Sequence, residues 1–157
     1  MQDKETHSVT SEVTRWFFFD DLPVGVGNGP SNTGAEFILE FWGVPLYDYD
    51  PEGGLWALNG DAVTGLLEVT HTRLKANGHA YTEVIDRSVR AYHDNGAAIE
   101  VIWSRRRADD TEIERLAAHF EVIRTKNGWR VAGIQHRPTH ADTLSEAWGV
   151  PGDGDLR

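Results

Sequence analysis

The sequence lacks cysteine and is poor in basic residues, and both shortages narrow what the protein can be. Without cysteine there are no disulfides and no thiolate chemistry. Lys and Arg number 15 against 25 Asp and Glu, a formal net charge of −10, whereas a general nucleic-acid binder needs a positive surface. No apolar run approaches the roughly 18 residues of a membrane-spanning helix, and residues 1–7 are polar, unlike a secretory leader. We therefore expect a cytoplasmic protein that binds neither nucleic acid nor membranes.

What the sequence does contain fits one folded domain with short extensions. Hydrophobic residues make up 39% of the chain and include six Trp and six Phe. A chain of 157 residues buries roughly two-thirds of its unfolded surface, which is enough for one core. We expect a flexible tail at 1–7, a domain at 8–138 and a partly disordered arm at 139–157. Within the arm, the spacing of Leu144 and Trp148 predicts a short helix that packs outside the body, in preference to a lid.

Apolar and polar residues alternate over three stretches between residues 97 and 138. This period of two predicts half-buried strands, because successive side chains of a strand point to opposite faces. Another stretch, which ends at His93, precedes them, and turn-forming sequences separate all of these stretches. We expect an antiparallel sheet whose apolar face carries Val89, Ala91, Ile99, Val101, Trp103, Leu116, Ala118, Phe120, Val122, Ala132 and Ile134.

The pairing of these strands depends on the length of the turns between them. Two of the turns contain Asn-Gly, at residues 94–96 and 126–128. Such turns form either two-residue loops or three-residue loops with a left-handed glycine. We choose three-residue loops, because they pair Ala91 with Ile99 and Val122 with Ala132, whereas the shorter loops would place charged residues opposite apolar ones.

Helical patterns come before the sheet. Apolar stripes or apolar surfaces predict helices at residues 8–20, 34–42 and 59–77. Asn59 or Asp61 can cap the last of them. Between the second and third helices, residues 44–58 predict a short hairpin that turns at the Pro-Glu-Gly-Gly sequence.

This order of elements resembles a known fold. The ending HFEVIRTKNGWRVAGI at 119–134 is similar to that of the nuclear transport factor 2-like (SnoaL-like) superfamily. FWGVPL at 41–46 and AIEVIWSRRR at 98–107 resemble an uncharacterised bacterial family, a domain of unknown function, within it. The resemblance covers residues 8–138 and implies an α+β, cone-shaped fold with three helices packed on a long curved antiparallel sheet. It also implies a cavity between helices and sheet, and a homodimer.

The expected pairing collects polar side chains at one end of the apolar face, with Arg105 opposite Glu114 and His136 opposite Ala118. We expect His136 to transfer protons, since imidazole titrates near neutral pH, and Arg105 to hold an anionic oxygen. Glu114 or Asp86 could act as a base, although Glu114 could also form a simple ion pair with Arg105 at the rim. The residues expected to line the pocket are Arg87 (opposite Trp103), Trp42, Trp103, Phe120 and Ala118. The competing interpretation makes Trp103 and Phe120 ordinary core.

These groups fit a cofactor-independent isomerase, cyclase or dehydratase acting on a hydrophobic carbonyl compound. The alternative is a non-catalytic dimeric scaffold or interaction module whose cavity is filled by its own aromatic side chains, and an accessory role in another pathway is a third possibility. No cofactor is implied, and no metal site is expected, because no helix aligns His136 with His140. The expected partners are a second copy of the chain and a hydrophobic small molecule.

Overall fold

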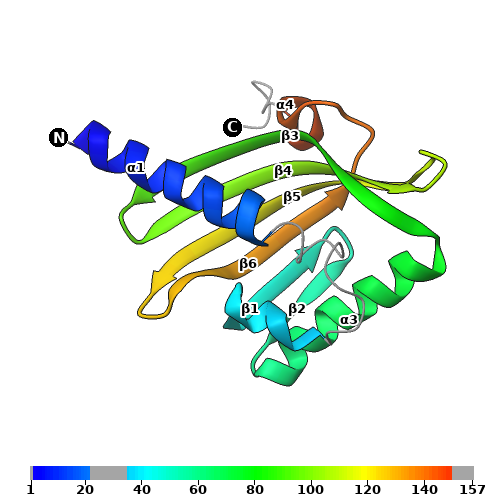
Figure 1. Ribbon diagram of the computed structural model, residues 1–157, viewed down its shortest axis with the longest axis horizontal. Coiled ribbons are helices and arrows are strands. Elements are labelled where there is room, and N and C mark those ends of the chain that lie inside the picture. The colour runs from blue at the N-terminus through cyan, green and yellow to red at the C-terminus, as the bar shows by residue number, and fades with distance from the viewer. Residues whose placement is uncertain (1, 22–34, 150–157) are drawn as a thin grey trace.

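The computed structural model describes residues 2–21 and 35–149, and its body is a six-stranded sheet of order β2-β1-β6-β5-β4-β3 (Figure 1). The strands are β1 (Trp42–Asp50), β2 (Gly53–Ala57), β3 (His79–His93), β4 (Gly96–Arg107), β5 (Glu112–Thr125) and β6 (Gly128–Pro138). The helical elements are α1 (Gln2–Arg15), the π-helical turn η1 (Trp16–Asp21), the 3-10 helix η2 (Ala35–Glu40), α3 (Gly60–Ala76) and α4 (Leu144–Trp148). The expected α+β fold is confirmed. None of the helices in these described ranges is long and apolar enough to cross a membrane.

The helix predicted at 59–77 is confirmed as α3. The Asn59 side chain accepts a hydrogen bond from the Ala62 N–H at 2.9 Å, so Asn59 is the N-cap. Gly78 follows the helix with a φ of +80°, a left-handed conformation that favours glycine. The second predicted helix is present as the shorter η2, and the hairpin predicted at 44–58 is present as β1 and β2.

The first helix is longer than expected at its start. α1 begins at Gln2, so helical backbone includes residues 2–7, where we expected a flexible tail. No glycine or proline interrupts this segment of the sequence, and nothing in it stops a helix. At its end the helix widens into η1, which brings Phe17 and Phe18 into the core.

The turn between β3 and β4 is shorter than predicted. His93 pairs with Gly96, so the connection has two residues, and the predicted three-residue loop is wrong. A β-bulge between Ala91 and His93 then shifts the register, and Ala91 pairs with Ala97, not with Ile99. Between this bulge and the next one, at Val84/Asp86, the difference from the expected register is two residues, so Val89 and Ala91 keep their predicted face.

The turn between β5 and β6 is also a two-residue connection, since Thr125 pairs with Gly128. A bulge at Ala132 again changes the count, and Val122 pairs with Val131 where we expected Ala132. Val131 is therefore fully buried in the core, and Ala132 is left out of the core cluster. The other expected pairs of β4 with β5 and of β5 with β6 are confirmed. The bulge changes the phase of the apolar alternation, from the buried Trp129 and Val131 to the buried Ile134. The prediction continued the phase of Ile134 to Ala132, which explains the error.

The two faces of the sheet bury different groups. The inner face and the helices share one core, to which the sheet contributes Leu46, Ala57, Ala97, Ile99, Val101, Trp103, Ala118, Phe120, Val122, Trp129, Val131 and Ile134. On the outer face, Ile102 and Ala117 pack against Leu144 and Ala147 of α4. The arm therefore packs outside the body, as predicted. Its last residues, 150–157, for which we expected disorder, lie outside the described ranges.

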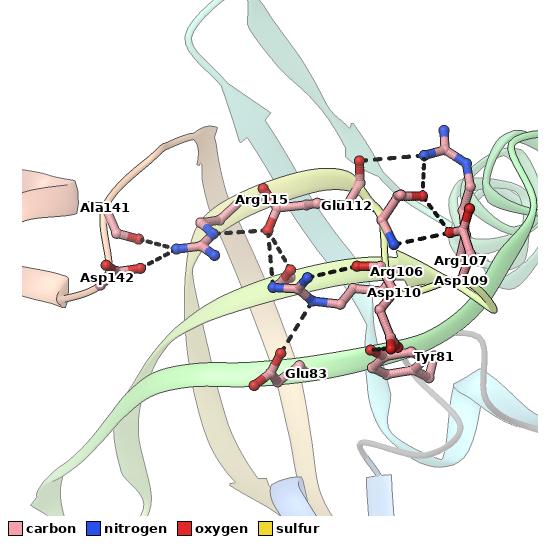
Figure 2. Close-up of polar contacts among 12 residues, drawn as sticks. Tyr81, Glu83, Arg106, Arg107, Asp109, Asp110, Glu112, Arg115, Ala141 and Asp142 are labelled. Atoms are coloured by element: carbon pink, nitrogen blue, oxygen red, sulfur yellow. Dashed lines mark hydrogen bonds and ion pairs between the residues drawn. The ribbon is translucent and has the colours of Figure 1, made fainter.

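Polar contacts fix the arm to the tip of the β4–β5 hairpin (Figure 2). Arg115 pairs with Asp142 and donates a hydrogen bond to the Ala141 carbonyl at 3.1 Å. Its Nε also lies 3.0 Å from Oε2 of Glu112 on the same strand. On β3, Asp86 accepts a hydrogen bond from the first N–H of α4 at 2.9 Å, so this carboxylate belongs to the outer face and not to a cavity.

The contact between Tyr47 on β1 and Gly133 on β6 allows the pairing of these two strands to be tested. A Cβ at Gly133 would lie 1.9 Å from the Tyr47 ring, which also packs 5.3 Å from the Trp56 ring, centroid to centroid. We expect G133A to destabilise the protein by about 1–3 kcal/mol in denaturant unfolding, because the ring must move. The same substitution in a Y47A background should cost much less.

A matched control is available in α3. A Cβ at Gly65 meets nothing within 4 Å, so G65A should stabilise the protein by about 0.5–1 kcal/mol. Equal effects of G133A and G65A would show that Tyr47 does not lie over Gly133.

Candidate functional site

A cavity of about 110 Å³ lies between the inner face of the sheet and α3, with η1 contributing Phe17 to its wall. Most of the wall is apolar and consists of Phe17, Trp42, Leu67, Trp103, Leu116, Ala118, Phe120 and Ile134. The polar lining residues are Asp48, Thr70, Arg73, Arg105 and His136. An apolar pocket with a few convergent polar groups is typical of small-molecule sites.

One pair of charged side chains comes from neighbouring strands, β1 and β6. On β1, Leu46 is fully buried, so Asp48, two residues later, points to the same inner face. His136 on β6 places its Nε2 3.0 Å from Asp48 Oδ1. Oδ1 is buried, and no described residue donates a strictly aligned hydrogen bond to it.

The Asp48 carboxylate raises the pKa of His136 above its usual value, and the partial burial of the ring opposes this. The imidazole is therefore protonated to a greater extent near neutral pH than that of a free histidine. An imidazole can both donate and accept a proton during a reaction.

A second charged group surrounds Arg105 on β4, which is only 8% exposed. Its Nε lies 3.3 Å from Glu114 Oε1 on β5. Arg73 of α3 donates one hydrogen bond to each carboxylate oxygen of Glu114, both at 3.0 Å. The Glu114 carboxylate thus forms ion pairs with two guanidinium groups. Burial lowers the pKa of Arg105, Glu114 opposes this effect, and the guanidinium stays charged at physiological pH.

Arg105 is incompletely satisfied. Its Nη1 is buried and has no hydrogen-bond partner within the described part of the chain. Burial, and then the charge of Arg105, lowers the pKa of His71 and of His79. Both imidazoles therefore lose their protons more readily than a free histidine.

Aromatic side chains close the inner end of the cavity. The Phe17 ring stacks on Trp103 at 6.2 Å between centroids and lies 4.8 Å from Phe120. Trp103 and Phe120 contact each other edge to face at 5.9 Å. They are 3% and 7% exposed, so they belong to the core as well as to the cavity wall.

Most residues expected at the site lie around the cavity. His136, Arg105, Trp42, Trp103, Phe120 and Ala118 all line it. Glu114 lies behind Arg105 and forms the ion pair considered as its alternative role.

Arg87 is not among the lining residues. The bulges in β3 place it opposite Val101, where Trp103 was expected, and its guanidinium lies 4.8 Å from the centre of the Phe18 ring. This expected pocket residue is therefore a surface cation that packs on an aromatic ring.

Sequence reasoning missed two charged lining residues, Asp48 and Arg73. Asp48 follows the apolar Leu46 by two residues, and this alternation could have assigned it to the inner face. Arg73 follows Thr70 by three residues along the apolar stripe of α3, so helical spacing could have placed it near the cavity. Nothing in the sequence shows that these elements meet His136 and Arg105.

The site offers a proton-transfer pair and a buried cation within an apolar wall. That set could move a proton on a bound compound and stabilise an oxygen that becomes negative. In the described ranges no group of three or more His, Asp or Glu side chains is placed to hold a metal ion.

Comparison with known proteins agrees with the fold. A family model described as NTF2-like protein (DUF6841) matches residues 11–139. A search of curated proteins found no match.

Solved structures share the architecture at low sequence identity. An NTF2-like protein of unknown function from Pseudomonas putida KT2440 is 13% identical, with a TM-score of 0.63 over 90% of this chain and 93% of that one. An NTF2-like protein from Novosphingobium aromaticivorans is 20% identical, with a TM-score of 0.61 over 88% and 86% of the two chains. A proposed ketosteroid isomerase from Parabacteroides distasonis ATCC 8503 is 11% identical, with a TM-score of 0.52 over 70% and 79%. At these identities the likeness concerns the fold alone.

The Asp48–His136 pair predicts how the histidine titrates. D48N should lower the pKa of His136, measured by NMR titration of its ring protons, because burial then acts without the carboxylate. D50N should lower it less, since Asp50 contributes a weaker charge effect.

The raised pKa of His136 in the folded state also determines how the stability of the protein changes with pH. The stabilisation from the pair is complete below the unfolded-state pKa of about 6.5 and is lost as pH rises through the folded-state pKa. Wild type should therefore lose its advantage over H136Q on going from mildly acidic to alkaline pH. An advantage that grows with pH would contradict the pairing.

Proposed function

Since this chain belongs to the NTF2-like protein family DUF6841, and since an apolar cavity lies beside its Asp48–His136 pair, we propose that it is a small-molecule pocket protein with cofactor-independent proton-transfer activity. The reaction class is isomerisation, cyclisation or dehydration of a hydrophobic carbonyl compound. The observation that carries the proposal is the convergence of a charged histidine pair and a buried arginine on one apolar cavity.

The roles follow from the chemistry of each group. The neutral form of His136 takes a proton from the carbon next to the carbonyl and returns it at another position, and Asp48 orients and stabilises the imidazolium that forms. Arg105 supplies positive charge for the enolate-like oxygen. Glu114 forms an ion pair with Arg105, at 3.3 Å, and is not required to contact the ligand.

Cavity size supports a small ligand. The volume is about 110 Å³, somewhat below the engineered apolar cavity of about 150 Å³ that binds benzene. Compounds of about six non-hydrogen atoms therefore suit the site better than a steroid.

The alternative function is a scaffold or interaction module with a filled cavity. It is favoured by the mutual packing of Phe17, Trp103 and Phe120, which occupy the inner end of the cone. In that case the charged groups around Arg105 serve stability alone.

The proposal retains two further expectations, a cytoplasmic location and a homodimer. The first is supported by the lack of cysteine. The second is supported by the mixed character of the outer face, where His119 lies between Glu100 at 3.3 Å and Glu121 at 3.2 Å.

Proton exchange on a small neutral ketone tests the proposed activity. In deuterated buffer the protein should accelerate exchange of the α-protons of methyl isopropyl ketone, followed by NMR, above the rate with free imidazole. H136Q should reduce the acceleration about 10²–10⁴-fold, the usual contribution of a positioned acid–base group. H119Q, on the outer face, should leave the rate unchanged.

Two results would overturn the proposal in different ways. Binding of the ketone without accelerated exchange would leave a binding protein without this activity. Absence of ketone binding to folded wild-type protein would favour the filled-cavity scaffold.

A further inference from the structure

The arginine end of the cavity carries more positive than negative charge. Arg105 and Arg73 both line the cavity, and among residues 2–21 and 35–149 Glu114 is the one carboxylate paired with either of them. The carboxylate that lines the cavity, Asp48, is paired with His136. This cationic end lies within a protein of net charge −10, so it does not reflect a generally basic surface.

Burial of Arg105 raises the free-energy cost of this excess positive charge. Only 8% of Arg105 is exposed, and its Nη1 has no hydrogen-bond partner in the described residues. A buried guanidinium N–H without an acceptor loses its hydration and gains nothing in return. His71 cannot supply an acceptor bond of good geometry, since its Nε2 is also buried and unpartnered among those residues.

A carboxylate on the ligand would supply the hydrogen-bond acceptor and the negative charge that Arg105 lacks. A guanidinium presents parallel N–H groups that match the two oxygens of a carboxylate. The rest of such a ligand would contact the apolar wall of Trp42, Leu67 and Phe120. The cavity volume of about 110 Å³ limits that part to a short chain.

We propose that the cavity selects a small monocarboxylate with a short apolar tail, and that its carboxylate binds the Arg105 guanidinium and the neighbouring Arg73. This inference rests on the proposed function and narrows its substrate class to carbonyl compounds that are also acids. Glu114 occupies part of the same cationic group, because Arg73 donates to both of its oxygens. Glu114 therefore competes with the ligand carboxylate for Arg73.

The test compares two ligands of the same shape, isovalerate and its neutral amide isovaleramide, in a buffer free of other carboxylates and of phosphate. Trp42 and Trp103 line the cavity, so their indole N–H signals in NMR titrations report binding locally. The remaining tryptophans serve as internal controls. Isovalerate should bind wild type about tenfold more tightly than the amide, the difference expected for a charge-assisted hydrogen bond.

Three substitutions sharpen the comparison. E114Q should tighten isovalerate binding at least about threefold and leave the amide unchanged, because it removes the competing charge. R105M should abolish the preference for isovalerate. R87M removes an arginine of the same sheet that does not line the cavity, and should preserve the preference. If R105M does not fold, R73M gives the same direction, since the Arg73 side chain is 47% exposed and tolerates replacement.

The outcomes separate this inference from the proposed function. Equal binding of acid and amide, or weaker isovalerate binding in E114Q, would overturn the carboxylate preference while leaving the proton-transfer proposal in place. Absence of any shift at Trp42 and Trp103 with either ligand would overturn the preference, and the ketone experiment would then decide the proposed function by itself.

Discussion

The parallel pairing of β1 with β6 is the contact on which the site depends. All other neighbouring strands are antiparallel and follow one another through short turns, whereas β1 reaches β6 from a distant part of the chain (Figure 1). Gly133 leaves room for the Tyr47 ring at this junction. Once β1 is in place, its inner face adds Leu46 to the core and Asp48 to the cavity. Without it, His136 would lie at an open sheet edge with no carboxylate beside it.

The bulges explain how long strands keep one apolar face despite short turns. A two-residue connection sets the register at the ends of the β3–β4 and β5–β6 hairpins, and a single extra residue then realigns the rest of the strand. In β6 this correction brings Val131 into the core and still leaves His136 facing inward opposite Ala118. In β3 it carries Arg87 away from the cavity. The bulges thus determine which polar side chains reach the cavity.

Local patterns in the sequence predicted the elements and faces well, because alternation and helical stripes report burial directly. They placed Arg105 opposite Glu114 and His136 opposite Ala118 correctly. They failed where the outcome depends on one inserted residue, as at Ala132, or on contacts between elements far apart in the chain. Asp48 and Arg73 belong to the second kind, since β1 and α3 meet the long strands only through tertiary packing. Alternation and helical spacing could assign each of them to a face, but not to a common cavity.

The cost of the charged groups argues that they do more than stabilise the fold. Buried ion pairs seldom outperform apolar residues of similar volume, because desolvation offsets most of their attraction. The aromatic cluster of Phe17, Trp103 and Phe120 shows that this chain can fill the cone with apolar side chains. At the other end of the same cavity it keeps Arg105 with an unpartnered Nη1, within the described residues, and an Asp48–His136 pair. A core selected for stability alone would replace these groups, so their retention beside an apolar space favours a ligand that completes them.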